Sequence, residues 1–260
     1  MRAMAVAGLA VVLGAAPARA LDLDVVKVRG TMRVIVAADE APETFALKPG
    51  TNAGFERELL EGFTQMNALR IEVVTARGYG DRIPMLLKGD GDVIVAIFDT
   101  PDRRRQVAFT AEVMPTHNVA VTLTPHRVVG TLTELKALKV GVIKGTKPAE
   151  TAVEAGVPPA AVVGFDRREE LLDALKNGDI GAGILPVSEL AIAARRLPGL
   201  RAGATVGERG KIAWAVRKED AALQRALDEY VRNVRRSTRW SRLIVKYFGD
   251  QALSVLGRGR

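Results

Sequence analysis

GDVIVAIFDTPDRRRQVAFT, residues 91–110, joins an apolar segment to a charged one. The apolar run Val93–Phe98 predicts a buried strand. Thr100 can cap the helix that follows, with Pro101 at its first position and Arg103 in its first turn near free backbone N–H groups. Ligands of open parallel sheets bind beyond the carboxyl ends of the strands. The stretch therefore predicts a guanidinium at a ligand-binding edge, where it can hold a carboxylate through two hydrogen bonds.

The residues before this stretch alternate between strand and helix patterns. Residues 32–37 and 71–75 are apolar and β-branched runs that predict strands. Residues 55–66 carry apolar side chains at helical spacing, and residues 81–88 predict a shorter helix closed by Gly89. The resulting order, strand-helix-strand-helix-strand, implies right-handed crossovers and a parallel sheet.

The same alternation returns later in the chain. Three more strands are predicted, with helices between them, at 140–143, 162–165 and 180–185. LLKGD at 86–90 and LKNGD at 175–179 each precede a strand, and this echo suggests two related α/β lobes. The extended segments 118–124 and 212–217 flank the second lobe. We expect these two segments to form a two-strand hinge.

The first twenty residues predict export. Arg2 precedes an apolar run at residues 3–16, and Ala18-Arg19-Ala20 has small residues at both positions of a cleavage site. The run is too short to span a bilayer comfortably. We therefore expect a signal peptide at residues 1–20, and a mature protein in the periplasm that does not span the membrane.

Composition excludes several classes of chemistry. The 260 residues include no Cys and two His, which leaves no thiolate metal site, cysteine nucleophile or multi-histidine centre. The net charge is +8, but the basic residues are spread, and 5% aromatic residues are poor material for stacking bases. We expect no metal, no cofactor and no nucleic-acid partner.

Four stretches carry a resemblance to a known family. They are GFEREL at 54–59, the stretch at 91–110, VGVIKGT at 140–146, and the segment 240–249 with its Trp-Ser-Arg start and Lys-Tyr-Phe-Gly end. In this order and spacing they resemble the family 3 extracellular solute-binding proteins, the periplasmic partners of polar amino-acid importers.

The resemblance implies a fold and a function. The fold is α/β, of the type II periplasmic-binding class, with two lobes joined by a two-strand hinge. Its expected limits are 21–118 for lobe 1, 119–211 for lobe 2 and 212–260 for the return to lobe 1. The implied function is capture of a small ligand, which closes the lobes, and a membrane permease then recognises the closed form. Such proteins are usually monomers, and no bond is made or broken.

The resemblance also implies ligand-binding positions. Arg103 matches the carboxylate-binding arginine of the family, and Thr146 follows a glycine at a strand-to-helix turn that favours anions. Thr146 is alternatively only a helix cap. Lys147 stands where the family often has a hydroxyl residue. The other candidates are Glu40, Phe45, Phe98, Tyr79 and Glu112. Phe45 is alternatively core, and Tyr79 alternatively surface; Arg104 and Arg105 are expected outside the cleft.

Three departures from the family pattern bear on the ligand. Phe98 stands where the family has a Ser or Thr. Pro186 stands where the family has the Asp that holds the α-ammonium, although an alignment shifted by two residues would place Ser188 there. Glu112-Val113 stands where the family has Pro-Tyr. A buried ammonium without its carboxylate is costly. We expect a carboxylate-bearing or partly apolar ligand. Two alternatives remain open: a periplasmic accessory or sensor protein with an eroded amino-acid site, and an enzyme built on the fold.

Overall fold

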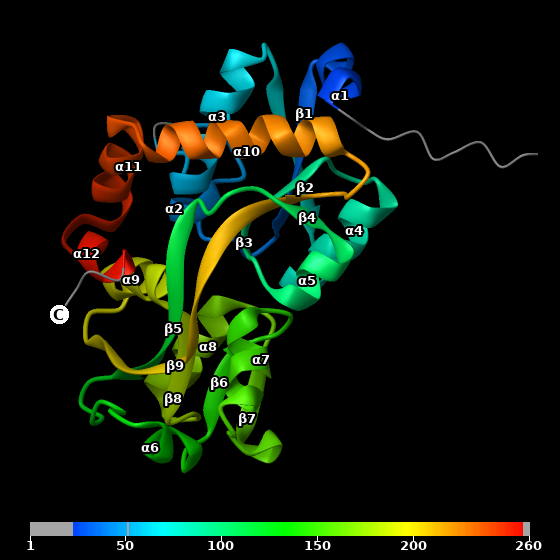
Figure 1. Cartoon of the computed structure of the whole chain (residues 1–260). Coiled ribbons are helices and arrows are strands. Elements are labelled where there is room, and N and C mark those ends of the chain that lie inside the picture. Colours follow the sequence, from blue (N-terminus) through cyan, green and yellow to red (C-terminus); the bar gives the residue numbers. More distant parts are fainter. Residues whose placement is uncertain (1–22, 51, 257–260) are drawn as a thin grey trace, which may run out of the picture.

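The computed structural model describes residues 23–50 and 52–256, so the expected signal peptide lies outside the described residues. Two α/β lobes are joined by two long strands, β5 (Met114–Leu123) and β9 (Leu200–Val216) (Figure 1). The lobe limits expected from the sequence stay a prediction, while the two-lobed architecture is confirmed.

Lobe 1 is built on a parallel sheet in the order β2-β1-β3, with β9 antiparallel beside β3. Its strands are β1 (Thr31–Ala37), β2 (Arg70–Ala76), β3 (Val93–Phe98) and β4 (Ala108–Phe109). Its helices are α1 (Leu23–Arg29), α2 (Pro42–Phe45), α3 (Phe55–Met66), α4 (Arg82–Lys88) after a 3₁₀ turn at Tyr79–Asp81, α5 (Pro101–Gln106), α10 (Ala221–Arg235), α11 (Thr238–Phe248) and α12 (Ala252–Val255), with a 3₁₀ turn at Gly249–Gln251.

Lobe 2 repeats the plan on a smaller scale. Its parallel strands are β6 (Val140–Ile143), β7 (Val162–Phe165) and β8 (Ala182–Pro186), with β5 antiparallel beside β8. Its helices are α6 (Leu132–Lys136), α7 (Lys147–Glu154), α8 (Arg168–Asn177) and α9 (Val187–Arg196), with a 3₁₀ turn at Pro159–Ala161. The sequence analysis gave no element for 187–196, although its Ala, Leu and Glu content favours a helix.

The hinge strands pair antiparallel with each other from Met114 opposite Ile212 to Leu123 opposite Leu200. The sheet is therefore continuous through both lobes, in the order β2-β1-β3-β9-β5-β8-β6-β7. β9 begins at Leu200, twelve residues before the predicted start at 212. Glycines and charged residues break the apolar pattern of its first half, which is a strand because β5 supplies the hydrogen-bonding partner.

The main core lies in lobe 1, where α3, α10 and α11 pack against the sheet. Trp214 of β9 is fully buried and stacks on Tyr230 of α10, with ring centroids 6.2 Å apart. Lobe 2 has further apolar clusters around Leu171 and Leu135. Ala191 and Ile192 of α9 pack into the lobe 1 core, and Ala37 and Tyr79 of lobe 1 pack into the cluster around Leu171. A rigid-body motion of the lobes about the hinge strands would separate these contacts.

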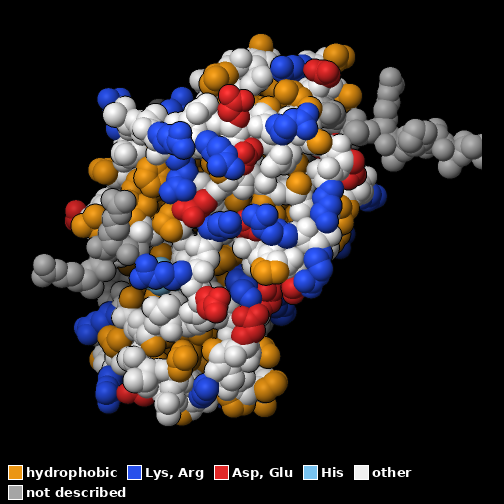
Figure 2. All heavy atoms as spheres, viewed as in Figure 1, with side chains coloured by type: hydrophobic (Ala, Val, Ile, Leu, Met, Phe, Trp, Pro, Cys, Tyr) orange, Lys and Arg blue, Asp and Glu red, His pale blue; other side chains and the backbone are white. Residues whose placement is uncertain are grey.

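Lys and Arg side chains cover much of the face seen in Figure 2, most densely over α10 and the hinge. Asp and Glu side chains lie among them. This arrangement is typical of a solvated basic surface. Within residues 23–50 and 52–256, none of the helices combines the length and apolar character that a bilayer crossing requires.

Candidate ligand-binding pocket

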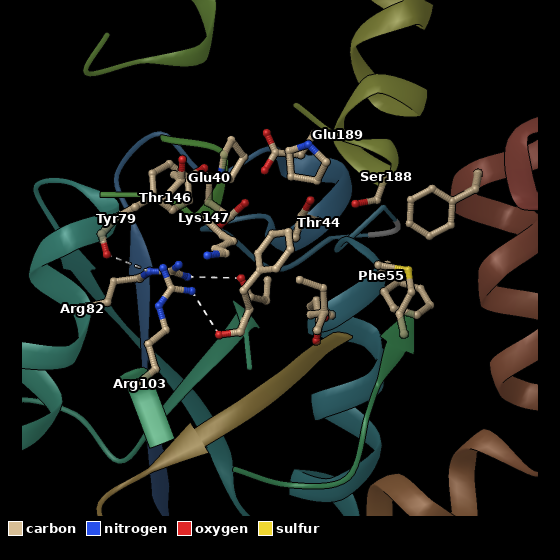
Figure 3. Close-up of a pocket in the computed structure, with 18 residues that line it drawn as sticks. Glu40, Thr44, Phe55, Tyr79, Arg82, Arg103, Thr146, Lys147, Ser188 and Glu189 are labelled. Carbon is tan, nitrogen blue, oxygen red and sulfur yellow. Dashed lines mark hydrogen bonds between the residues drawn. The ribbon is translucent and has the colours of Figure 1, made fainter. Parts of the chain in front are cut away.

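A pocket lies between the two lobes and is lined by residues of both (Figure 3). The space inside it amounts to about 640 Å³, counting the part that is open to solvent. The lobes are closed around it, since Arg103 of lobe 1 lies 3.6 Å from Glu150 of lobe 2. Its walls come from the carboxyl ends of β1, β3 and β8, the first turns of α3, α4, α5 and α7, and the hinge residues Met114 and Ile212.

Arg103 reaches the pocket from the first turn of α5, as the sequence predicted. The Thr100 hydroxyl caps this helix by accepting the Arg103 backbone N–H at 3.3 Å, with Pro101 at the first position. The guanidinium donates from Nη1 to the Phe98 carbonyl at 3.0 Å and lies 3.6 Å from Glu150 of α7, across the cleft. Burial and the neighbouring Arg82 lower the pKa of Arg103 to about 10. The group stays cationic at neutral pH.

Arg82 is a second pocket guanidinium, which the sequence analysis did not single out. It begins α4, is 4% exposed, and lies beside Arg103 in Figure 3. Its Nη1 donates to the Val95 carbonyl at 3.2 Å, and its guanidinium lies over the Tyr79 ring, 4.9 Å from the centroid. The buried Arg82 guanidinium and the half-buried Arg103 guanidinium lie side by side and repel each other, so an anion between them is favourable.

An irregularity in β3 shapes the wall around Arg82. The pairing of β3 with β9 shifts register between Ile94 and Ile97, and Ala96 has a φ of +49°. The Val95 and Ala96 carbonyls at this irregularity both face the Arg82 guanidinium. Left-handed backbone at a residue other than glycine or asparagine is strained and is concentrated at functional sites.

Lobe 2 supplies the start of α7. Thr146 occupies the N-cap position, but its hydroxyl donates to the Ile143 carbonyl at 2.6 Å and does not cap the helix. Lys147 lines the pocket and forms ion pairs with Glu154 at 2.7 Å and Glu150 at 3.4 Å. Lys147 therefore adds a third positive charge to the end of the pocket formed by Arg82 and Arg103.

The opposite end of the pocket is acidic. Glu40 follows β1 and is 8% exposed, and burial raises its pKa. Glu189 of α9 lines the same end and is held by Arg168, whose Nε donates to its Oε2 at 3.1 Å. Tyr79 is buried between these groups, and its hydroxyl accepts from Arg168 Nη2 at 3.2 Å. The cationic and acidic groups meet at Tyr79: Arg82 lies over its ring, Arg168 binds its hydroxyl, and both guanidiniums act on Glu40.

Glu56 is a buried acid in the wall of the pocket. It lies in the first turn of α3, is 1% exposed, and accepts the Trp214 indole N–H on Oε2 at 2.5 Å. Its other oxygen, Oε1, has no hydrogen-bond partner among the described residues. Burial raises the pKa of Glu56 to about 8. At neutral pH the group is mostly a neutral carboxylic acid, which can donate a hydrogen bond to a ligand oxygen.

Six of the eight sequence-predicted residues line the pocket: Glu40, Tyr79, Phe98, Arg103, Thr146 and Lys147. Their role as ligand contacts stays a prediction. Phe45 is fully buried and belongs to the lobe 1 core, which is the alternative given for it. Its ring packs under the Arg57 guanidinium. Glu112 lies outside the pocket and pairs with Arg235 at 2.9 Å. The structure therefore does not place Glu112 with the other ligand-binding candidates.

The departures from the family pattern lie in the pocket itself. Phe98 forms its apolar wall together with Phe55, Met114, Ile212 and Phe248, and both Pro186 and Ser188 line the lobe 2 side. Arg104 and Arg105 point elsewhere, since they pair with Asp99 and Asp102 at 2.5 and 2.7 Å.

Curated relatives with a similar sequence are membrane-bound lytic murein transglycosylases F. That of Stutzerimonas stutzeri is 25% identical over 257 residues, which cover 96% of this chain and 52% of the relative. That of Pseudomonas syringae pv. syringae is 28% identical over 264 residues, which cover 96% of this chain and 51% of the relative. The chain thus spans about half the length of the curated relatives it matches.

Solved structures with a similar fold are amino-acid-binding proteins. The amino acid ABC transporter substrate-binding protein AbpA of Streptococcus pneumoniae, bound to L-arginine, has a TM-score of 0.78 and 19% identity, covering 90% of this chain and 99% of that one. The solute receptor for L-cysteine of Neisseria gonorrhoeae has a TM-score of 0.76 and 22% identity, covering 91% of this chain and 95% of that one. At these identities the likeness establishes the fold, a type II periplasmic-binding fold. Residues 32–250 match the model of the bacterial extracellular solute-binding proteins, family 3, and the chain belongs to this family.

Proposed function

We propose that the protein is exported to the periplasm and captures a small carboxylate-bearing ligand between its lobes, as a monomer that delivers this ligand to the permease of an ABC-type importer. The observation that carries the proposal is the pair of guanidiniums in an interlobe pocket, the buried Arg82 and the half-buried Arg103. No catalytic step is needed for this function.

The chemistry of capture follows from the positive end of the pocket. A guanidinium holds a carboxylate through two parallel, charge-assisted hydrogen bonds. Arg103 comes from lobe 1 and Lys147 from lobe 2, so a carboxylate between them contacts both lobes. Glu150 already links these cations at 3.6 and 3.4 Å. A ligand carboxylate would displace this half-exposed side chain and stabilise the closed arrangement.

The first prediction tests capture directly. The chain from residue 21 onward is titrated with acetate, succinate, glutarate, 3-methylbutanoate and the common amino acids by calorimetry and thermal unfolding. A ligand at a hundredfold excess over Kd stabilises the fold by about 2.7 kcal/mol. Hydrogen bonds to charged groups contribute roughly 1.5–3 kcal/mol each, so Arg103→Gln should weaken binding by about 10- to 100-fold.

Arg104→Gln is the matched control, because Arg104 is on the same helix and pairs with Asp99 outside the pocket. Its ligand affinity should equal that of the unsubstituted protein. Equal affinities for the Arg103 and Arg104 variants, or no stabilisation by any carboxylate, would contradict the proposal.

A second candidate function is an accessory or sensor role in cell-wall metabolism. It is favoured by the curated relatives, whose name is that of a murein-cleaving enzyme and of which this chain spans about half. Cross-linking in intact cell envelopes separates the two functions. An importer subunit as the cross-linked partner supports transport, and a murein-cleaving enzyme supports the accessory role.

A further inference from the structure

Arg168 is a buried cation at the acidic end of the pocket. It begins α8, is 4% exposed, and is separated from the pocket by the side chains it holds, Tyr79 and Glu189. Both Nε and Nη2 of its guanidinium lie 3.1 Å from Glu189 Oε2, and Nη2 also donates to the Tyr79 hydroxyl at 3.2 Å. One internal guanidinium therefore binds an acidic and a hydroxyl group that face the ligand.

Arg168 also links the two lobes. Its backbone N–H donates to Asp39 Oδ2 at 2.7 Å, and Asp39 and Tyr79 belong to lobe 1, whereas Arg168 and Glu189 belong to lobe 2. The charges that act on Arg168 are the carboxylates of Glu189, Glu40 and Asp39 together with the Tyr79 hydroxyl, and they keep its pKa raised. The guanidinium is thus a permanent charge of the closed arrangement.

This arrangement changes what the acidic end can bind. Glu40, Glu56 and Glu189 are the carboxyl groups among the described pocket residues. Burial raises the pKa of Glu40 and raises that of Glu56 to about 8, and Arg168 pairs with Glu189. A ligand that places its carboxylate between the guanidiniums would point an α-ammonium into a region where Arg168 already neutralises Glu189. Lys147 and the two pocket arginines would add repulsion. An ammonium buried there is poorly compensated, whereas an apolar or neutral group is not penalised.

We propose that Arg168 is a built-in counter-cation that makes the pocket selective for carboxylates without an α-ammonium group. Arg168 is a positioning residue, since it acts through Glu189 and Tyr79. The inference rests on the proposed capture of a carboxylate and adds the class of ligand. The Pro186 and Phe98 departures agree with it, because neither side chain can accept a hydrogen bond from an ammonium.

The test compares matched pairs that differ only in the amino group: succinate with aspartate, glutarate with glutamate, and 3-methylbutanoate with leucine. Calorimetric titration of the unsubstituted chain should give at least tenfold tighter binding of the amine-free member of whichever pair binds. In Arg168→Met, Glu189 is released, and this ratio should fall at least tenfold. Arg167→Met is the control, because Arg167 precedes Arg168 but is exposed and pairs with Glu170.

Each outcome decides between the two proposals. If an amino acid binds the unsubstituted chain as tightly as its amine-free partner, the selectivity inference is overturned and capture stands. If no member of any pair binds, carboxylate capture itself fails. Glu189→Gln added to Arg168→Met should restore the original ratio, and a ratio that Arg168→Met leaves unchanged also overturns the inference. The measurements on the unsubstituted chain decide the class of ligand even if Arg168→Met does not fold.

Discussion

Glu56 shows how one buried side chain makes stability depend on pH. Its ordinary pKa is 4.5, and burial raises the folded-state pKa to about 8. Between these values the folded protein holds a proton that the unfolded chain has lost. The contribution of Glu56 to the free energy of unfolding is therefore greatest below about pH 4.5. It falls by about 1.4 kcal/mol per pH unit as the pH rises toward 8.

The prediction at this scale concerns Glu56→Gln, which keeps the shape and the acceptor for Trp214 but cannot ionise. Urea unfolding at pH 5.5 and pH 8 should show a smaller loss of stability for the variant than for the unsubstituted protein. The difference between the two losses should be a few kcal/mol, since about two and a half pH units separate the measurements. Glu72→Gln, at an exposed position of β2, is the control and should change nothing. Equal pH dependence of Glu56→Gln and the unsubstituted protein would show that Glu56 is ionised in the fold.

A site residue could be predicted from the sequence where its neighbours in the chain determine its position. Arg103 could be placed because Thr100 and Pro101 fix a helix start two positions before it, directly after a strand. Arg82 and Glu56 are held in the pocket wall by residues far along the chain: Arg82 by carbonyls of the irregular part of β3, and Glu56 by the Trp214 indole of β9. The available signal was their position: Arg82 begins α4, the helix after the second strand, and Glu56 lies in the first turn of α3, between the first and second strands.

At the scale of elements, α5 positions Arg103, the group proposed to bind a carboxylate. It has six residues and would be marginal without its cap, because short helices gain little from their own hydrogen bonds. The Thr100 hydroxyl bonds the backbone of Arg103 itself. Loss of this cap should therefore disturb the residue that the pocket depends on.

We predict that Thr100→Ala lowers the free energy of unfolding by about 1 kcal/mol and weakens ligand binding several-fold. Thr131→Ala is a matched control, since Thr131 caps α6 in the same way, by accepting the Glu134 N–H at 3.2 Å, and lies away from the pocket. It should lose similar stability and keep full affinity. Urea unfolding and calorimetry measure the two quantities, and an equal loss of affinity in both variants would contradict the role given to α5.

Elements were predictable where one sequence pattern matched one environment. The strand 93–98 is apolar throughout and the strand 32–37 is apolar except for Arg33, because helices cover both faces of a parallel sheet. Both strands were predicted within a residue of their ends. The part of β9 before residue 212 was not predicted as a strand, since it contains Gly203, Gly207 and Gly210 and much of it is exposed. Its strand conformation comes from pairing with β5, which a pattern within one segment does not reveal.

The whole molecule is held closed by contacts between the lobes. Arg196 of α9 pairs with Glu43 at 2.7 Å, Arg168 bonds Asp39 and Tyr79, and the backbone of Gly145 meets that of Gly80. Gly145 has a φ of +70°, and a Cβ there would lie 2.5 Å from the Gly80 backbone nitrogen. This position requires glycine for two reasons: the left-handed backbone and the close approach of the other lobe.

The second of these reasons applies only when the lobes are closed, so Gly145→Ala should bias the protein toward an open arrangement. We expect a larger radius of gyration by small-angle X-ray scattering at saturating ligand and binding at least tenfold weaker than normal. The Gly80 backbone can relieve the clash only by moving away from lobe 2, and a ligand held by both lobes then loses contacts on one side. Gly178→Ala is the matched control, because Gly178 has a φ of +79° but no atom within 4 Å of the added Cβ. Both variants carry the same backbone strain, of about 1 kcal/mol, and should lose similar stability. A normal radius and affinity in Gly145→Ala would mean that the lobes do not need the Gly80–Gly145 contact to hold a ligand, and the closed arrangement would then not be the one that captures it.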